Sequence, residues 1–527
     1  MFSKEYDFKK LSDWSNCRAC LILAIFIALP MLMRPGDHSS GRHEDLVIVG
    51  GQIIDGTRNP AYRADILISE GKIAFIGSID TNSMPGMVIH ADDKIITPGF
   101  IDSHAHGDPL TEDFENFLAM GVTTVLLGQD GSSPVNAVNY DHPKLYFDRL
   151  ERARKLINLA FLSGHGTIRS RLGYTSPAPL NAHELNQLKE HTAISLESGC
   201  FGLSTGLEYL PGALAGEDEL TELAQVVGNF DGIMMSHLRS EDDSLMEASL
   251  NELIRLNRYC RAHVSHIKVV FGKSAARGEE ILSLLYQNNT EGTLAISADV
   301  YPYMASYTGI GIVFPPWAKT RTSFEMARLN RREELEKYLY NKIMARNGPG
   351  ATLFASRPFT GKTLEEVSNE SGKSFVEILM NLGPQGASGA YFVMNEALQE
   401  VFITDPRIAI ASDGGPSLRH PRSYGTFAKI INKYVQKEKK LSLEQAIHKM
   451  TGLPAQIIGL EGRGTIKVGN YADLLIFDPA QVEDHATFSD PYLISTGFEY
   501  IFINGNLVRQ KEKDLCLDCG SLLKKTH

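Results

Sequence analysis

The stretch FIDSHAHGD, residues 100–108, carries two histidines one residue apart at the end of an apolar run that begins near residue 94. In an extended chain, residues i and i+2 point to the same face, so His104 and His106 can present two imidazoles to one point. Neutral imidazole is a versatile ligand for zinc and related ions. An isolated H-x-H pair is common by chance, so its meaning depends on the residues that accompany it along the chain.

Downstream of this pair, short apolar runs alternate with charge-bearing helical stretches, which is typical of a parallel sheet with helical crossovers. Eight such runs predict a (β/α)8 barrel. Residues 304–407 are too long for one crossover and contain helical patterns at 328–346 and 363–382, so we expect an inserted helical subdomain over the barrel mouth. The predicted strands are 100–102, 123–128, 159–163, 201–205, 232–236, 263–269, 294–299 and 408–412.

Glycine-punctuated β-rich runs flank the predicted barrel on both sides. Residues 45–56 and 64–77 precede it, and residues 469–477 and 500–508 follow it. We therefore expect one small sheet domain assembled from both ends of the chain.

The chain has 527 residues, 43% of them hydrophobic, and a net charge of -11, which argues against nucleic acid as a partner. Residues 19–33 form an apolar run that is short for a membrane span and follows several basic residues, so we expect a signal peptide or short membrane anchor within residues 1–43. The protein would then be exported or anchored facing outside the cytoplasm; a cytoplasmic chain is the alternative.

Two C-x-x-C pairs, Cys17/Cys20 and Cys516/Cys519, could bind zinc or cycle as dithiols. Nothing in the sequence brings them together, so incidental thiols at loose termini are the favoured interpretation. Cys200 and Cys260 have the surroundings of ordinary buried thiols.

Six polar residues fall at the carboxyl ends of predicted strands, where barrel enzymes build their active sites. Four histidines and two carboxylates at that face can hold one or two divalent ions. Any one of them could be a buried scaffold residue, but packing alone rarely places six together. These residues are His104, His106, Asp130, His237, His266 and Asp413.

The ordered motifs around these residues resemble the N-acyl-D-amino-acid deacylases (D-aminoacylases) of the amidohydrolase superfamily, from about residue 45 to residue 508. The resemblance is carried by PGFIDSHAHGD (98–108), GHGTIR (164–169), GLSTGLEYLPG (202–212), SHLRSED (236–242), VSHIK (264–268), DVYPY (299–303), PPW (315–317), SDGG (412–415), HPRSYGTF (420–427) and DHATFSDP (484–491).

This resemblance implies a distorted (β/α)8 barrel, a small β-sandwich and zinc-dependent hydrolysis of an N-acyl amide. Matched positions imply His104, His106, His237, His266 and Asp413 as metal ligands. Where this chain has Asp130, the family usually has a cysteine ligand. The domain organisation we expect is 44–97 and 456–510 for the sandwich, 98–455 for the barrel, and 511–527 for a polar tail.

The implied reaction converts an N-acyl-D-amino acid to a carboxylate and a free D-amino acid. Asp413 is suited to pass a proton from water to the departing amine. Matched positions place Lys268 and Arg422 at the substrate carboxylate, and Tyr301 and Ser306 can add hydrogen bonds. Because a carboxylate is a harder donor than a thiolate, Asp130 would let Mn²⁺ or Co²⁺ replace zinc more readily. The alternatives are hydrolysis of a cyclic amide or dipeptide, and a catalytically silent barrel used as an interaction scaffold.

Overall fold

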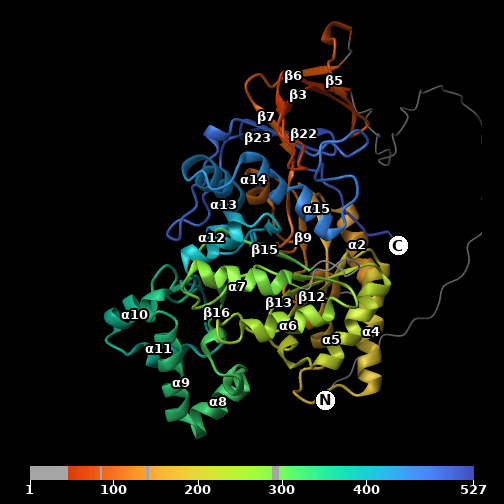
Figure 1. The fold of residues 1–527 in the computed structure, drawn as a ribbon. Helices are drawn as coiled ribbons and strands as arrows, with labels where there is room; N and C mark the ends of the chain where they lie inside the picture. Colours follow the sequence, from red (N-terminus) through yellow and green to blue (C-terminus); the bar gives the residue numbers. More distant parts are fainter. Residues whose placement is uncertain (1–44, 84–85, 138–141, 288–295, 527) are drawn as a thin grey trace, which may run out of the picture. The chain divides into compact units, whose positions relative to one another are not determined.

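The computed structural model describes residues 45–83, 86–137, 142–287 and 296–526. They belong to one compact unit, His43–His527. Parallel strands and helices alternate through its middle (Figure 1), which confirms the predicted α/β class. The apolar run 19–33 and the pair Cys17/Cys20 lie outside the described residues. Among the described residues, no helix is long and apolar enough to cross a membrane.

A parallel barrel forms the centre of this unit. Its strands form two hydrogen-bonded runs that join at two places. At one, Leu162 N donates to Leu127 O at 2.8 Å; at the other, His106 N donates to Gly414 O at 2.7 Å. The second closure uses residues beyond the strand ends, so the barrel is distorted as predicted. The first run contains β8 (Phe100–Asp102), β9 (Val122–Leu127) and β10 (Asn158–Phe161); the second contains β11 (Ser163–Gly164), β12 (Gly202–Gly206), β13 (Ile233–His237), β14 (Arg261–Val264), β15 (Ser297–Val300) and β19 (Ile408–Ile410).

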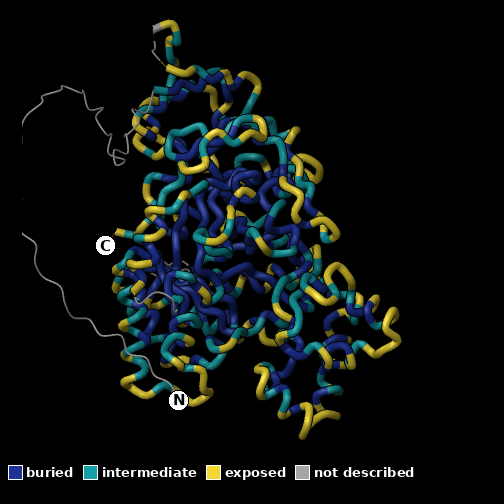
Figure 2. The backbone as a smooth tube through the Cα atoms, turned by 180° about the vertical axis from the view of Figure 1, so that it is seen from behind, coloured by how far each residue is buried: buried dark blue, intermediate teal, exposed yellow. Residues whose placement is uncertain are grey.

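Helices cover the outside of the barrel, and buried residues gather between them and the strands (Figure 2). The sequence determines where these helices begin: Asn181, just before α4, and Glu184 in its first turn form a reciprocal capping box. Strands covered on both faces are buried along their whole length, as β9 is. The outer helices include α4 (Ala182–Glu197), α5 (Glu217–Asn229), α6 (Met246–Leu256) and α7 (Ala275–Tyr286).

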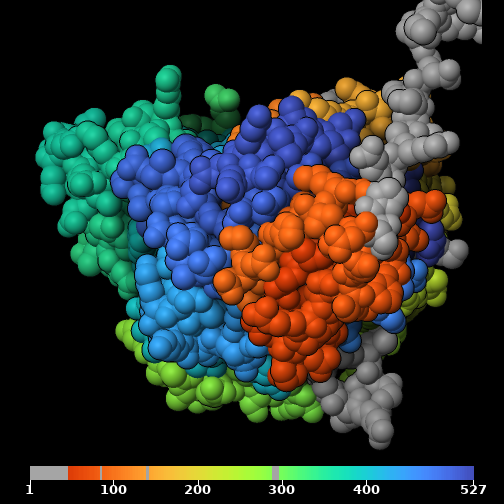
Figure 3. All heavy atoms as spheres, turned by 90° about the horizontal axis from the view of Figure 1, so that it is seen from above, coloured from red at the N-terminus to blue at the C-terminus, as the bar shows by residue number. Residues whose placement is uncertain are grey.

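Two sheets with a shared apolar core form the sandwich, and both ends of the described chain contribute to it (Figure 3). The link is the antiparallel pairing of β7 (Ile95–Pro98) with β20 (Leu474–Phe477). Because Gly99 alone separates β7 from β8, the sandwich leads directly into the first barrel strand. The four-stranded sheet contains β5 (Lys72–Gly77), β4 (Asp65–Ser69), β1 (Leu46–Val49) and β6 (Met87–His90); the seven-stranded sheet contains β23 (Lys513–Asp514), β22 (Asn506–Gln510), β21 (Phe498–Ile503), β20, β7, β2 (Gln52–Ile53) and β3 (Tyr62–Arg63).

The insertion between β15 and β19 is not purely helical, which corrects the prediction. It contains an antiparallel sheet in the order β16-β18-β17 and a core of its own. The predicted helical stretch 363–382 is two helices, because Gly372 ends the first in a left-handed conformation and Ser374 caps the second. The elements are β16 (Ser306–Gly309), α8 (Arg321–Asn330), α9 (Arg332–Ala345), β17 (Thr352–Phe354), α10 (Leu364–Ser371), α11 (Phe375–Leu382) and β18 (Ser388–Tyr391).

The C-terminal residues are not a loose tail. Cys516 and Cys519 form a disulfide, so they are not the incidental thiols that the sequence favoured. Both half-cystines pack with Leu522 against the main core. Leu159 N donates to Ser521 O at 2.9 Å, and Lys525 N donates to Gly199 O at 3.0 Å. The segment therefore covers amino ends of barrel strands, opposite the face that carries the predicted ligands. Cys200 and Cys260 are buried free thiols, as predicted.

Candidate active site

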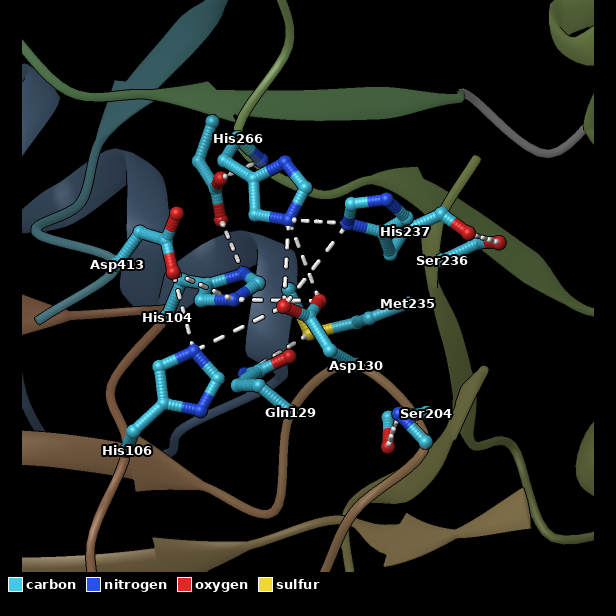
Figure 4. Close-up of polar contacts among 12 residues, drawn as sticks. His104, His106, Gln129, Asp130, Ser204, Met235, Ser236, His237, His266 and Asp413 are labelled. Carbon is cyan, nitrogen blue, oxygen red and sulfur yellow. Dashed lines mark hydrogen bonds and ion pairs between the residues drawn. The ribbon is translucent and has the colours of Figure 1, made fainter. Parts of the chain in front are cut away.

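All six predicted ligands converge at the carboxyl ends of the barrel strands, with their side chains directed toward a common centre (Figure 4). His104 and His106 follow β8, and Asp130 follows β9. His237 ends β13, His266 follows β14 and Asp413 follows β19.

The histidines form two pairs, and Asp130 faces both. Nδ1 of His237 lies 3.0 Å from Nε2 of His266. Oδ1 of Asp130 lies 3.3 Å from Nε2 of His266 and 3.4 Å from Nε2 of His104. Nε2 of His106 lies 3.7 Å from Oδ2 of Asp130. Donor atoms on one tetrahedral zinc stand roughly 3.2–3.6 Å apart, given bonds of about 2.0–2.2 Å. The spacing therefore suits the coordination of one or two divalent ions by these side chains.

Asp413 completes the His104/His106 side of the site. Its Oδ1 lies 3.0 Å from Nε2 of His106 and 3.7 Å from Nε2 of His104. Its Oδ2 lies 2.7 Å from Nη1 of Arg422. One carboxylate therefore faces the metal position with one oxygen and a fixed cation with the other.

Unsatisfied buried atoms support a metal site. Both ring nitrogens of His104 and Oδ1 of Asp130 are buried without a hydrogen-bond partner among the described residues. Buried polar atoms are normally hydrogen-bonded, so unpaired nitrogen and oxygen atoms gathered at one point are suited to coordinate a metal ion. Imidazole nitrogens and carboxylate oxygens are the donors that zinc accepts.

The electrostatics keep the two carboxylates ionised, while His266 has to release a proton when a cation binds. Burial and Lys268 oppose protonation of His266, but Asp130 and Asp413 outweigh them and raise its pKa to about 10. Burial opposes ionisation of Asp130, but His266 and His104 outweigh it and hold the pKa of Asp130 well below its usual range. Burial also opposes ionisation of Asp413, yet Arg422 and His266 depress the pKa of Asp413. Burial lowers the pKa of His104, which favours its neutral, coordinating form.

Three of the ligands have left-handed backbone conformations: φ is 54° at Asp130, 39° at His266 and 49° at Asp413. Such values are uncommon outside glycine and cluster at functional sites. Each follows a barrel strand, so the turn directs the side chain back toward the barrel mouth.

Three carboxylates around the ligands were not assigned from the sequence. Oε2 of Glu208 lies 3.2 Å from Nε2 of His237, and Oε1 of Glu241 lies 3.2 Å from Nδ1 of His266. Asp299 accepts a hydrogen bond from the backbone N of His266 at 2.6 Å. Carboxylates that hold the second nitrogen of a metal-bound histidine are common in zinc sites. All three lie within motifs that carry the family resemblance, at 202–212, 236–242 and 299–303, and this position was the signal that could have identified them.

A cavity of about 530 Å³ opens onto this site, and Lys268, Ser306 and Arg422 form part of its wall. Nζ of Lys268 lies 2.6 Å from Oε1 of Glu241. Tyr301 is placed differently from the expectation, because it is fully buried behind the wall. Its ring centre lies 4.9 Å from the guanidinium carbon of Arg422 and 5.8 Å from Nζ of Lys268, so it supports both cations. Tyr307, on β16, lines the cavity instead.

Known proteins share this fold and chain length. The amidohydrolase family model matches residues 335–509. N-acyl-D-glutamate deacylase from Alcaligenes xylosoxydans xylosoxydans is 32% identical over 485 residues, covering 88% of this chain and 93% of that protein. D-aminoacylase from the same organism is 30% identical, covering 92% of this chain and 98% of that protein.

A crystal structure of N-acyl-D-glutamate deacylase from Bordetella bronchiseptica, complexed with zinc and a phosphonate mimic of the tetrahedral intermediate, superposes with a TM-score of 0.79. It is 30% identical and covers 92% of this chain and 100% of that one. The barrel and its ligand set thus define an amidohydrolase. More narrowly, the chain belongs to the N-acyl-D-amino-acid deacylase (D-aminoacylase) family, as its motifs indicated.

Proposed function

We propose that this protein is a zinc-dependent amidohydrolase that cleaves N-acyl-D-amino acids to a carboxylate and a free D-amino acid. The observation that carries the proposal is one cavity whose wall combines the converging ligands with two fixed cations, Lys268 and Arg422. An N-acyl amino acid needs both features, because it has an unreactive amide and a carboxylate that can be held by charge.

His104, His106, Asp130, His237, His266 and Asp413 would hold the metal. Zinc held by these residues would polarise the amide carbonyl and lower the pKa of a water molecule. Asp130 in place of a thiolate should make the site accept Mn²⁺ or Co²⁺ as well.

Asp413 has the position of the proton carrier. It takes a proton from the attacking water and passes it to the departing nitrogen, which leaves as a neutral amine. Arg422 keeps the carboxylate of Asp413 ionised before the reaction. Arg422 and Lys268 bind the substrate carboxylate, Tyr301 fixes the two cations from behind, and the hydroxyl of Ser306 offers a hydrogen bond at the wall.

A stereochemical screen tests this function. The zinc-loaded full chain should hydrolyse N-acetyl-D-amino acids and leave the L-isomers intact, and Asp413→Ala should abolish turnover. Activity on cyclic amides or dipeptides alone would favour another amidohydrolase reaction. No turnover on any amide, with no bound metal, would favour a catalytically silent scaffold.

We also propose that residues 19–33 direct export or a membrane tether facing outside the cytoplasm. The run follows basic residues, and the Cys516–Cys519 disulfide suits an oxidising compartment. Fractionation with N-terminal sequencing tests this, since an intact Met1 in the cytosolic fraction would support the cytoplasmic alternative.

A further inference from the structure

His263 is a fully buried histidine on β14, a few residues before the ligand His266. Its Nε2 lies 2.8 Å from Oδ2 of Asp299 on β15, and its Nδ1 lies 2.8 Å from Oγ of Ser297. Asp299 is fully buried as well. Apolar side chains of similar volume stabilise a core about as well as a buried ion pair does, so this pair indicates a role other than packing.

The Asp299 carboxylate supports the turns that carry two of the ligands. Its Oδ1 accepts a hydrogen bond from the backbone N of His266 at 2.6 Å, and its Oδ2 accepts one from Oγ of Ser103 at 3.1 Å. Oδ2 also lies 4.0 Å from Nδ1 of His104. The rings of His104 and His266 are directed toward the same centre (Figure 4), with ring centres 4.8 Å apart. One carboxylate therefore fixes the turn after β8 relative to the turn after β14.

His263 contacts this carboxylate from the neighbouring strand. An ionised carboxylate only accepts hydrogen bonds, so Nε2 of His263 carries a proton and donates a hydrogen bond to Oδ2. Burial opposes ionisation of Asp299, but His263 and His104 outweigh it and lower its pKa. Within the described part of the chain, no lysine or arginine forms an ion pair with Asp299. His263 is therefore the side chain that both orients Asp299 and stabilises its charge at hydrogen-bond distance.

We infer that His263 is a positioning residue for the metal site and acts through Asp299. Without His263, Oδ2 of Asp299 loses the shorter of its two side-chain hydrogen bonds, and the carboxylate can turn away from His266. His266 has a left-handed backbone conformation, with a φ of 39°, so it depends on such support. The inference rests on the proposed function for turnover, whereas metal binding can be measured without a substrate.

The test compares His263 with a second buried histidine–carboxylate pair. His263→Leu removes the hydrogen-bond donor, and His263→Gln returns an amide that can donate to Asp299. His165→Leu is the matched control, because Nε2 of the buried His165 lies 2.8 Å from Oε1 of Glu219 and His165 is not a predicted ligand. The full chain is loaded with Zn²⁺ or Co²⁺, and near-UV circular dichroism shows which variants are folded. The measurements are ion affinity by competition with a chelator, the visible spectrum of bound Co²⁺, and kcat and KM on N-acetyl-D-amino acids.

We expect His263→Leu to bind both ions about 10–100-fold more weakly than wild type, which is the scale of a lost partner around metal ligands. Its Co²⁺ spectrum should shift, because the spectrum reports the arrangement of the donor atoms around the ion. At saturating metal, kcat should fall by about tenfold and KM should stay within about threefold, because Lys268 and Arg422 are unchanged. His263→Gln should recover most of the ion affinity. His165→Leu should be less stable than wild type but keep the wild-type ion affinity and spectrum.

A folded His263→Leu variant with wild-type ion affinity and spectrum would overturn the inference, and so would an equal loss of affinity in His165→Leu. If His263→Leu does not fold, Asp299→Asn decides, because it replaces the carboxylate that His263 holds; unchanged ion affinity in that variant would overturn the inference too. If His263→Leu changes metal binding as expected but wild type hydrolyses no amide, the proposed function fails and the positioning role stands. If wild type hydrolyses N-acetyl-D-amino acids and His263→Leu equals it in ion affinity and kcat, the proposed function stands and the positioning role fails.

Discussion

At the scale of single residues, Asp130 is the position with the largest expected effect on the metal. It faces His104 and His266 at 3.4 and 3.3 Å, so it belongs to both halves of the site. We predict that Asp130→Ala loses bound metal and at least about 100-fold of kcat/KM together. Asp130→Cys should keep the metal and shift preference toward zinc, because a thiolate is the softer donor. Elemental analysis and turnover on the same samples provide the check, and an Ala variant that retains both would make Asp130 structural.

Arg422 is the second residue with a specific expectation. We predict that Arg422→Met lowers kcat/KM by about two to three orders of magnitude, the scale of a lost buried charge-assisted pair. Arg422→Lys should recover part of the lost kcat/KM, because lysine keeps the positive charge but lacks the planar guanidinium that binds a carboxylate with two hydrogen bonds. Steady-state kinetics on one N-acetyl-D-amino acid decides, and an unaffected Met variant would mean that the substrate carboxylate binds elsewhere.

Sequence reasoning was strongest for residues whose place is fixed by a strand end. His104, His106, Asp130, His237, His266 and Asp413 were all brought together, because parallel strands deliver their ends to one face. Tyr301 also follows a strand, but its ring turned behind the wall. Which way a side chain turns after a strand depends on neighbours distant in sequence, and these are not visible in a local pattern.

At the scale of elements, a buried ion cluster fixes α3 (His165–Arg171) to α5. Glu219 on α5 lies 2.8 Å from Nε2 of His165 and 2.5 Å from Nη1 of Arg169. Through Gly166, Thr167 and Ser170, α3 also forms part of the cavity wall.

We predict that Glu219→Gln lowers the free energy of unfolding by about 3–5 kcal/mol at pH 7, as expected when a buried pair loses one partner. Burial opposes ionisation of Glu219, but His165 and Arg169 outweigh it and lower its pKa. A depressed carboxyl pKa stabilises the fold above the usual carboxyl range, and this contribution is lost as pH falls through the folded-state value. Denaturant titrations of wild type and Glu219→Gln should therefore show that the difference between their free energies of unfolding is smaller in the acid range than at pH 7. The same difference in unfolding free energy at both pH values would contradict a role for the charge of Glu219.

Helices and strands could be predicted where the hydrophobic spacing was regular and capping or turn residues marked their ends. The barrel strands fall close to their expected positions, as β12 (Gly202–Gly206) does beside the predicted 201–205. The small sheet of the insertion was missed, because β17 and β18 are short and pair across long sequence separations. Long-range pairing of short strands leaves little periodic signal.

At the scale of the whole molecule, the C-terminal segment covers part of the amino-end face of the barrel. Its Cys516–Cys519 disulfide packs against the main core, and Nζ of Lys525 lies 3.0 Å from Asp231 just before β13. The sequence suggested a polar tail, because the packing residues Cys516, Cys519 and Leu522 do not follow the regular hydrophobic spacing that would predict a helix or a strand.

We predict that the Cys516→Ser/Cys519→Ser double variant loses roughly 2 kcal/mol of unfolding free energy while kcat/KM stays unchanged, because the metal site is at the opposite face. Wild type treated with a reductant should lose the same amount, and the double variant should not respond. A loss of turnover in the variant would show that the segment influences the site.

The long insertion between β15 and β19 also sets an order of events during synthesis. Asp413 follows β19, so the complete ligand set cannot exist until about a hundred residues after β15 have left the ribosome. At about 5–20 residues per second, that is a wait of roughly 5–20 s in which four histidines and Asp130 are already made. During that interval the growing chain carries the four histidines and Asp130 without Asp413, so the six residues of the site can come together only after the insertion has been made.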